Sequence, residues 1–579
     1  MEVVARRTAD AAAFARAGSE QRIAVARAVL DCALLAAVIG ISTLPYVRGL
    51  GFYYDDYSVL AQLNGAHDQS LIGLYHAVRP LNGQRPLQSL TFAALYRLFG
   101  LNPLGYHVVN AFLFVAVAWF LYLVLRELRL PRLVCVALPL VYSILPHYAT
   151  NRFWLDAFQI TVSNAFYLLS LYAGLRALRA RPAAIAGWLI LAAAAVAGSV
   201  FAYEVVFPLF ALEIGLLWWA ARRAPRPVPV ARWLTIGGLA SAIVVVGVIK
   251  ATLVAEHGQN GYQVGFQDGL AHHLAYLVSG SIKLNAGSYL LAVPYVLWWI
   301  IRHRLTAANA GAAGAAGLLA FGYVWWIGRR DREALMGART WRDCVRVGLI
   351  AFVLGYAIFL TNRQVLFRSA GIDNRVNAAA ALGVAAILVG AIGWIAGRLT
   401  EPRGIAFYSA SVGCIVATGV LIIATLGSFW TSAAKEQHAI VSSLQRTAPS
   451  LPLSSTVVLD SVCPEIGPAV VFADQWDLRG ALALAYHDPS LAADAATEDL
   501  RAGSRRLELE MTFLGGRSTR TYAYDPHLFV YDFPRRTLHV LRDQSEAAGY
   551  VSSERPSFKC PPQRSFAWGF DPSRRLSLP

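Results

Sequence analysis

Two adjacent carboxylates, Asp55 and Asp56, follow the first long apolar run of the chain, and tyrosines at positions 53, 54 and 57 surround them. Paired carboxylates in an aromatic setting can act as a general base or bind a divalent cation. A helix cap or a solvated turn is the alternative explanation for such a pair. The sequence that follows the pair favours the chemical explanation.

Residues 85–87 are Arg-Pro-Leu, and residues 98–110 are LFGLNPLGYHVVN. The order of an acidic pair after the first helix, RPL, a short amphipathic segment and GLNPxGYHxxN resembles the GT-C superfamily of membrane glycosyltransferases. The nearest resemblance is to proteins related to protein O-mannosyltransferases. It is strong over residues 50–130 and looser to about residue 400, and the C-terminal part shows none of it.

The resemblance implies a polyprenyl-phosphate-sugar donor, a site on the outer face of the membrane and inversion at the anomeric carbon. It also implies that Asp55 or Asp56 deprotonates the acceptor hydroxyl. The leaving group is already a phosphate, so one base and cationic groups on the phosphate suffice. We favour Asp55 as the base and Asp56 as its orienter or as a metal ligand, and a divalent cation such as Mg²⁺ or Mn²⁺ stays open as a cofactor.

Three arginines, Arg363, Arg368 and Arg375, lie in one loop that we expect on the outer side. Outer loops are usually poor in arginine, and a guanidinium matches phosphate oxygens bidentately. GT-C enzymes place an arginine near this point of the chain to hold the donor phosphate, so Arg375 is the first candidate and Arg363 the second. A surface pair between Arg368 and Asp373 is the alternative and would explain one of the three.

The segment around His147 is similar to a PxHxEAVxW stretch of the same relatives. Thr150 stands where the relatives carry an acidic residue, which weakens an inherited metal or acid role. Asp156 is a possible substitute for that residue, and His147 with Asp56 is the candidate metal pair. A hydrogen-bonded cap is the alternative role for His147.

Glu204 follows Tyr203 at a place where the relatives carry Lys-Glu. Glu204 lies between two apolar runs, where an ionised side chain costs free energy unless it has a partner or a function. A structural salt bridge or a contact with the acceptor would explain it, and the same two roles are open for Arg85.

Of the 579 residues, 56% are hydrophobic and 15% are charged, and mean hydropathy is +0.47. This composition indicates a membrane protein, in which helices formed by apolar runs would position the polar groups named above. A helix that spans a bilayer needs about 20 largely apolar residues. The runs cover residues 28–46, 105–125, 133–150, 158–175, 183–201, 204–221, 233–255, 286–301, 308–327, 347–361, 376–396 and 405–429, with a weaker run at 266–282. The sequence therefore predicts about thirteen transmembrane helices, of which the first is retained rather than cleaved.

Arginine gathers at the N-terminus and at residues 329–346, among other short segments between the runs. Short cytoplasmic loops carry such an excess, so topology explains the formal net charge of +16 and nucleic-acid binding is not expected. We expect residues 1–27 in the cytoplasm, residues 28–429 in a bacterial inner membrane and the loop 47–104 in the periplasm. This orientation requires the run at 266–282 to cross as well.

The composition changes beyond residue 430, where Asp, Glu, Pro and Ser become more frequent. Strand-like segments at 456–459 and 527–531 and a length of about 150 residues indicate a soluble α/β domain over residues 430–579, which we expect in the periplasm. Cys463 and Cys560 are its two cysteines, and an oxidising compartment would join them. The metal-site spacings CxxC and HExxH do not occur.

The sequence thus predicts a polytopic α-helical membrane protein of GT-C type with a C-terminal α/β domain. The predicted activity is transfer of a sugar from a polyprenyl phosphate to a glycan, a lipid or a protein. A transporter or flippase of lipid-linked sugars is the alternative, although the halves of the chain show no repeat with corresponding broken helices. A catalytically silent assembly protein ranks last, because the acidic pair is present. Neither the sugar nor the acceptor can be named, since specificity lies in pocket shape.

Overall fold

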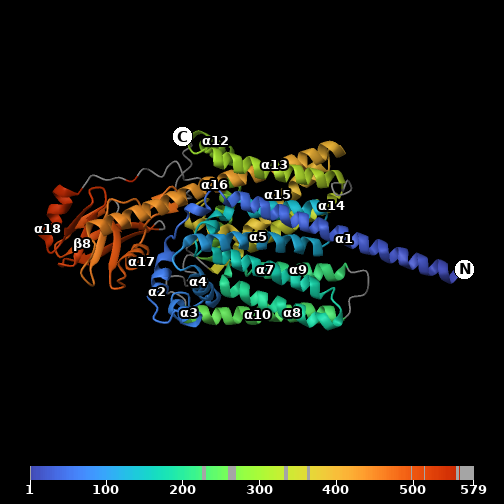
Figure 1. The fold of residues 1–579 in the computed structure, drawn as a ribbon, viewed down its shortest axis with the longest axis horizontal. Coiled ribbons are helices and arrows are strands. Elements are labelled where there is room, and N and C mark those ends of the chain that lie inside the picture. Colours follow the sequence, from blue (N-terminus) through green and yellow to red (C-terminus); the bar gives the residue numbers. More distant parts are fainter. Residues whose placement is uncertain are drawn as a thin grey trace.

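The computed structural model of the chain describes residues 2–223, 230–257, 269–330, 337–361, 365–496, 499–513, 516–555 and 560. Helices form a bundle in which most axes follow the longest axis of the molecule, and a smaller domain with the strands covers one end (Figure 1). We call this end of the bundle the domain end. The N-terminus lies at the opposite end, where α1 extends beyond the other helices (Figure 1).

The helices of the bundle follow the apolar runs of the sequence. They are α1 (Glu2–Thr43), α5 (Pro103–Glu127), α6 (Arg132–Ile144), α7 (Phe158–Ala177), α8 (Pro182–Ala202), α9 (Leu209–Arg222), α10 (Val230–His257), α13 (Ala307–Arg330), α14 (Ala338–Ala357), α15 (Ala378–Ala396) and α16 (Glu401–Thr447). Short helices between them are η1 (Val47–Gly49), α2 (Asp55–Asn64), α3 (Leu71–Val78), α4 (Pro86–Phe99), η2 (Pro146–Arg152), η3 (Glu204–Val206), η7 (Ile358–Thr361) and η8 (Ile372–Asn377). Within the described residues, 8 helices could cross a membrane by length and composition, or up to 10 if each bent pair is one span. The protein is a multi-pass membrane protein, with fewer such spans than the sequence predicts.

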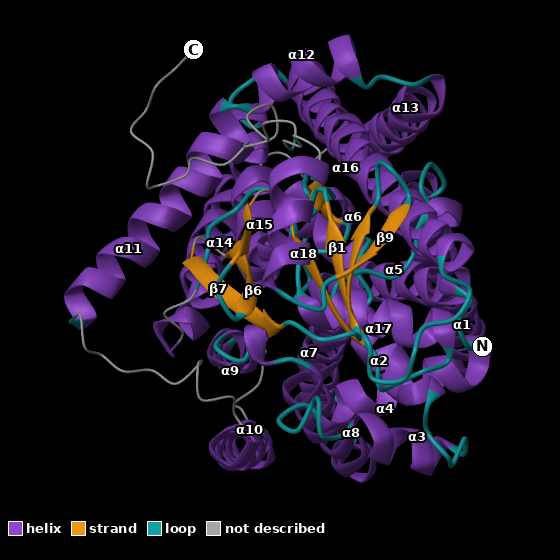
Figure 2. Ribbon diagram, turned by 90° about the vertical axis from the view of Figure 1, so that its left-hand side faces the viewer, coloured by secondary structure: helices purple, strands orange, loops and turns teal. Residues whose placement is uncertain are grey.

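One bent unit accounts for part of this difference. It consists of α11 (Leu270–Ile282), the π-helix η5 (Lys283–Leu291) and α12 (Val293–His303), and it is bent by 51° at the break after η5. α11 runs across the view in Figure 2, in which α10 is seen end-on, so α11 lies across the bundle rather than along it. The structure thus corrects the prediction that 266–282 and 286–301 are two separate crossings. The N-terminus and the C-terminal domain lie at opposite ends of the bundle (Figure 1).

Close contact between α14 and α15 fixes the segment that joins them. A Cβ atom on Gly355 of α14 would lie 2.4 Å from the backbone N of Ala380, and one on Gly383 of α15 would lie 2.4 Å from the backbone N of Phe352. Small residues let helices approach this closely in a membrane. The short helix η8, which directly precedes α15, is therefore held by a tightly packed pair.

The longest helix, α16, joins the bundle to the C-terminal domain. Its 47 residues extend over about 70 Å at 1.5 Å per residue, whereas the hydrocarbon core of a bilayer is about 30 Å thick. The predicted boundary at residue 430 falls inside this helix, because the apolar sequence ends there but the helix does not. In the continuation, Gln437 Nε2 donates to the Val471 carbonyl (2.7 Å) and Ser443 Oγ accepts from the Tyr531 hydroxyl (2.8 Å).

The C-terminal part is an α/β domain, as the sequence predicts. Its main sheet has the order β4-β1-β8-β9, in which β1 is parallel to β4 and β8, and β9 is antiparallel to β8. The elements are β1 (Thr456–Asp460), β2 (Glu465–Ile466), β3 (Ala469–Val470), α17 (Gln475–Tyr486), β4 (Ala492–Ala496), β5 (Asp499–Ala502), β6 (Arg506–Phe513), β7 (Gly516–Ala523), β8 (Leu528–Asp532), β9 (Thr537–Val540), α18 (Gln544–Gly549) and η9 (Tyr550–Glu554). A disulfide joins Cys463 and Cys560, whose Cα atoms lie 5.5 Å apart, within the usual range.

Candidate active site at the domain end

A strained turn leads into α2 and sets the position of the acidic pair. Tyr54 has φ of 50° and ψ of −118°, a conformation that costs an L residue free energy and persists only where the surroundings hold it. The Tyr54 ring is buried between Trp154 and Trp476, with centroid distances of 5.9 and 5.4 Å. This packing holds the turn, so that Asp55 and Asp56 begin α2.

Asp56 is an internal anchor. Its side chain is fully buried, and its two oxygens accept from three backbone N–H groups: Tyr53 (2.9 Å), Leu155 (3.4 Å) and Asp156 (2.9 Å). These bonds tie the start of α2 to the loop that follows η2. Asp56 therefore has the geometry of an orienter, and its oxygens are occupied by the backbone.

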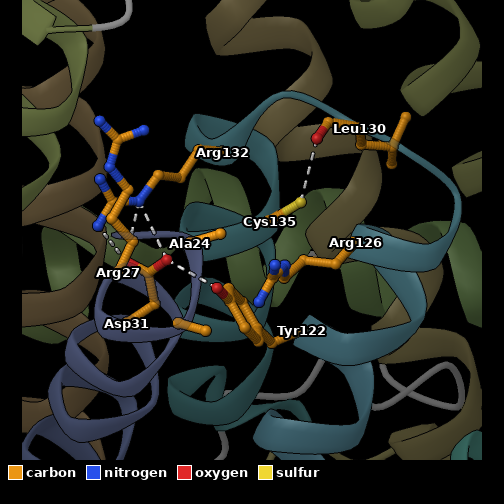
Figure 3. A pocket seen from close by; sticks show the side chains of 9 residues that line it. Ala24, Arg27, Asp31, Tyr122, Arg126, Leu130, Arg132 and Cys135 are labelled. Carbon is orange, nitrogen blue, oxygen red and sulfur yellow. Dashed lines mark hydrogen bonds and ion pairs between the residues drawn. The ribbon is translucent and has the colours of Figure 1, made fainter. Parts of the chain in front are cut away.

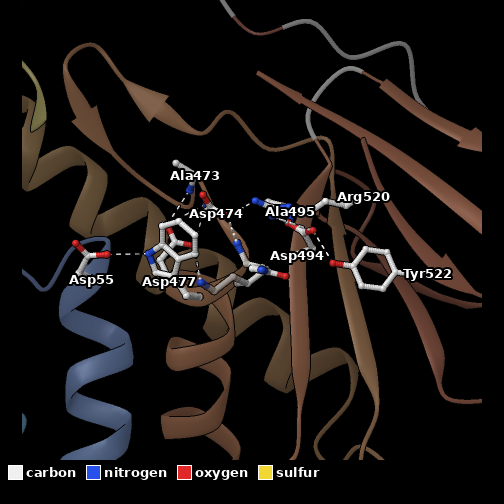
Figure 4. Close-up of polar contacts among 11 residues, drawn as sticks. Asp55, Ala473, Asp474, Asp477, Asp494, Ala495, Arg520 and Tyr522 are labelled. Atoms are coloured by element: carbon white, nitrogen blue, oxygen red, sulfur yellow. Dashed lines mark hydrogen bonds and ion pairs between the residues drawn. The ribbon is translucent and has the colours of Figure 1, made fainter. Parts of the chain in front are cut away.

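Asp55 has the geometry of a base. Its Oδ1 accepts from Trp476 Nε1 at 2.8 Å (Figure 4), and its other oxygen accepts from no residue in the described ranges. Burial raises the pKa of Asp55 to about 7 and the Asp156 carboxylate adds to this, while the Arg375 guanidinium and the Trp476 bond act in the opposite direction. A carboxylate with a pKa near 7 and a free oxygen suits proton abstraction near neutral pH.

Asp156 lies close enough to Asp55 and to two arginines to interact with them electrostatically. It accepts from Gln88 Nε2 at 2.5 Å. Burial raises its pKa, and the positive charges of Arg375 and Arg85 oppose this rise. Asp156 thus belongs to the same polar group as Asp55.

Arg375 in η8 is the cation of this group. Its guanidinium lies over the Trp154 ring, 4.7 Å from the centroid, and the side chain is half-buried. It makes no hydrogen bond or ion pair with any part of the chain that the structure describes. Its positive charge interacts with Asp55, Asp156 and Asp373. A half-buried guanidinium with five unused donors is a site for an anion, and phosphate matches its fork.

Arg368 of this loop differs from Arg375. Arg368 lies 3.4 Å from Asp373, Nε to Oδ2, and its side chain is 48% exposed, which is the surface pair considered as the alternative. Arg363 lies outside the described residues. Of the two arginines of this loop that the structure describes, Arg375 is the one that lies by the acidic pair.

Glu204 takes part in a half-buried ion cluster. It accepts from Arg85 at 2.5 Å (Nη2 to Oε1) and 3.1 Å (Nε to Oε2), and from Lys250 Nζ at 3.0 Å. These two cations hold the pKa of Glu204 far below its usual value, against the effect of burial. Arg85 also lies over the Tyr203 ring, 4.0 Å from its centroid. Both Glu204 and Arg85 thus have structural partners and border the site.

His147 packs against another segment. Its ring is buried and stacks on Tyr289 of η5, with a centroid distance of 3.8 Å, and neither ring nitrogen has a hydrogen-bond partner among the described residues. No contact with Asp56 is present there. In the same residues, no group of three or more His, Cys, Asp or Glu side chains could hold a metal ion. The structure does not bring together the candidate metal pair.

No family model matches the chain, and no curated protein matches it. Two solved structures are similar to it over most of its length. One is ArnT from Cupriavidus metallidurans bound to undecaprenyl phosphate, with 14% identity, 79% of this chain and 84% of that chain covered, and a TM-score of 0.36. The other is the same protein in the apo state, with 14% identity, coverage of 80% and 85%, and a TM-score of 0.31.

TM-scores this low carry no argument about the site. The function proposed below therefore rests on the residues and their geometry.

A polar hollow at the N-terminal end has a different character from the group at the domain end. It has a volume of about 220 Å³ and lies between α1, α5 and α6 (Figure 3). Both oxygens of Asp31 are occupied there: Arg132 donates to them at 2.7 and 3.0 Å, and the hydroxyls of Tyr122 and Tyr323 donate at 2.7 and 2.8 Å. With its carboxylate fully paired, this hollow lacks the free base found at the domain end.

Sequence reasoning missed several residues of the site. Trp476 lies 421 residues from Asp55 in sequence, and its local sequence carries no signal of the contact. Trp154 stands at the tryptophan of the PxHxEAVxW stretch, but that stretch does not predict its contact with Arg375. Lys250 could have been found, because a lysine within an apolar run is costly and needs a partner.

Proposed function

We propose that the protein is a glycosyltransferase that moves a sugar from a polyprenyl phosphate to an acceptor hydroxyl. The observation that carries this proposal is the juxtaposition of Asp55 and Arg375 in one half-buried group, in which one Asp55 oxygen and the Arg375 guanidinium have no hydrogen-bond partner among the described residues. The motifs at residues 50–130 that resemble GT-C enzymes support the same activity.

In the proposed reaction, the free oxygen of Asp55 takes the proton of the acceptor hydroxyl. The acceptor oxygen forms a bond to the anomeric carbon of the sugar, and the bond from that carbon to the phosphate oxygen breaks. The pair of electrons leaves with the polyprenyl phosphate, whose charge Arg375 stabilises. Attack opposite the leaving group inverts the anomeric carbon.

An apolar groove beside the site suits the polyprenyl chain. It has a volume of about 460 Å³ and lies between α3, α4 and α8. Its lining is Leu71, Ile72, Tyr75, Pro86, Leu87, Leu90, Ala197, Gly198 and Phe201. Pro86 in the groove lining directly follows Arg85 in sequence, so this part of the groove lies near the ion cluster of Arg85 and Glu204.

Purified protein incubated with a panel of radiolabelled polyprenyl-phosphate sugars tests the proposal directly. We expect one donor to be consumed and its label to move to an envelope glycan, a lipid or a protein added as acceptor. Transport of the lipid-linked sugar across vesicles without release of polyprenyl phosphate would identify a flippase instead and refute the proposal.

We place the domain end in the periplasm and the N-terminus in the cytoplasm of a bacterial inner membrane. The arginine-rich segment 329–346 supports this orientation, because such segments stay cytoplasmic. Alkaline phosphatase fused after residue 500 should therefore be active, and the same enzyme fused after residue 340 should be inactive. The reverse pattern would place Asp55 on the cytoplasmic side, where the proposed reaction does not occur.

A further inference from the structure

Helix α17 of the C-terminal domain touches α2 backbone to backbone. A Cβ atom on Gly480 of α17 would lie 2.5 Å from the carbonyl carbon of Tyr57 and 2.7 Å from the backbone N of Ser58. A glycine at this position therefore allows the contact. The Tyr57 hydroxyl also lies 3.3 Å from Oε1 of Gln437 in α16. The domain is thus seated on the helix that carries the acidic pair.

The first turn of α17 is held in place from within the domain. Asp474 and Asp477 form a capping box at its start. Arg520 of β7 pairs with Asp474 and also with Asp494 of β4, the latter at 3.0 Å (Figure 4). Tyr522 donates to Asp494 at 2.6 Å. A chain of charged contacts thus fixes the turn from which residue 476 extends.

The residue that this turn presents to α2 is Trp476. Its Nε1–H donates to Asp55 Oδ1 at 2.8 Å, and its ring packs against Tyr54, 5.4 Å between centroids. The bond occupies one of the two oxygens of Asp55 and leaves the other for a substrate. A hydrogen bond to a charged group is short and directional, so it also sets the direction in which the free oxygen points.

We infer that Trp476 is a positioning residue of the transfer reaction, and that the C-terminal domain forms part of the active site by holding Asp55 through this indole. The inference rests on the proposed function, in which Asp55 is the base. It gives the domain a task in catalysis that its own sequence does not reveal.

The bond should also set the acidity of Asp55. The charged groups that act on Asp55 are Asp156, Arg375 and Asp474, together with the Trp476 bond, which favours the ionised carboxylate. Loss of the indole N–H should therefore raise the pKa of Asp55 further. A base with a higher pKa is protonated over a wider range at acid pH, so the acid limb of the rate profile should move toward higher pH.

Trp476→Phe tests the inference, because phenylalanine keeps a ring against Tyr54 and removes only the N–H. We expect the acid limb of kcat/KM to move up by about one pH unit and kcat at pH 7 to fall about tenfold, with the KM for the donor unchanged. Gly480→Ala should move the acid limb in the same direction, because its Cβ pushes α17 away from α2. Alanine favours a helix over glycine, so α17 itself would not be weakened.

Tyr486→Phe is the matched control. It removes a hydroxyl bond to Ala448 (2.8 Å) at the other end of the same helix, and its pH profile should equal that of the wild type. If the wild type is active and Trp476→Phe keeps the wild-type acid limb, the inference is wrong and the proposed function stands. A wild type that transfers no sugar from any donor overturns both.

Discussion

Replacement of Asp55 by asparagine is expected to lower turnover by about 10² to 10⁴-fold, the usual contribution of a general base. The amide has nearly the shape of the carboxylate, and its oxygen can still accept from Trp476, so the fold and donor binding should persist. It cannot take a proton from the acceptor. Steady-state rates with the identified donor, together with binding of that donor to the inactive variant, measure the two parts of this result.

The pH dependence gives a second readout for the same residue. Burial raises the pKa of Asp55 to about 7, so the ionised, active form declines as pH falls through 7, and kcat/KM of the wild type should decline with it. Asp55→Asn should show no such limb. Asp68→Asn is a matched control, since Asp68 is exposed and bonds only to Ser70 among the described residues. A variant Asp55→Asn with more than a tenth of wild-type turnover would exclude Asp55 as the base.

Replacement of Arg375 by alanine is expected to weaken binding of the polyprenyl phosphate and to lower kcat/KM by about 10² to 10³-fold. The guanidinium would serve the phosphate both before and during transfer, so both the Kd and the chemical step should suffer. Arg375→Lys should recover part of the activity, because lysine restores the charge but not the bidentate fork. Titration with polyprenyl phosphate and single-turnover rates separate the two effects.

Arg368→Ala is the control for this experiment. Arg368 lies in the same loop, is exposed and pairs with Asp373, so its loss should change the Kd for polyprenyl phosphate less than threefold, as expected for an exposed pair worth less than about 1 kcal/mol. Equal losses in Arg368→Ala and Arg375→Ala would show that the loop attracts the phosphate by its total charge. In that case Arg375 would have no special contact.

Much of the bundle could be predicted from the sequence because its signals are local. An apolar run in a membrane needs only its own residues to become a helix, and the described residues of the predicted runs are mostly helical. The bent unit of α11, η5 and α12 shows where the rule ends. An apolar run of sufficient length can form a helix along the bundle axis or one transverse to it. Contacts with distant segments decide between these two orientations. In α11, the Tyr276 hydroxyl donates to the Val365 carbonyl at 2.7 Å.

The site could be predicted in part for the same reason. Asp55 and Arg375 stand out from their own surroundings, one as half of an acidic pair and the other as an arginine in an outer loop. The sequence favours Asp55 as the base and Asp56 as its orienter. The physical reason for the difference depends on the fold, because it is Asp56 that accepts from the backbone N–H groups of Leu155 and Asp156. Trp476 could not be predicted, since its partner is reached only through the fold of another domain.

Helix α16 couples the height of the C-terminal domain to its rotation. Each residue of an α-helix adds about 1.5 Å of rise and turns the chain by about 100°. One residue added beyond Trp430 would therefore lift the domain and swing the first turn of α17 around the helix axis, away from α2. An insertion of about seven residues, two full turns, would again direct α17 toward α2, but it would move the domain about 10 Å further from the bundle. The length of α16 thus determines both the distance and the rotation of the C-terminal domain relative to α2, and the contact between α17 and α2 requires both.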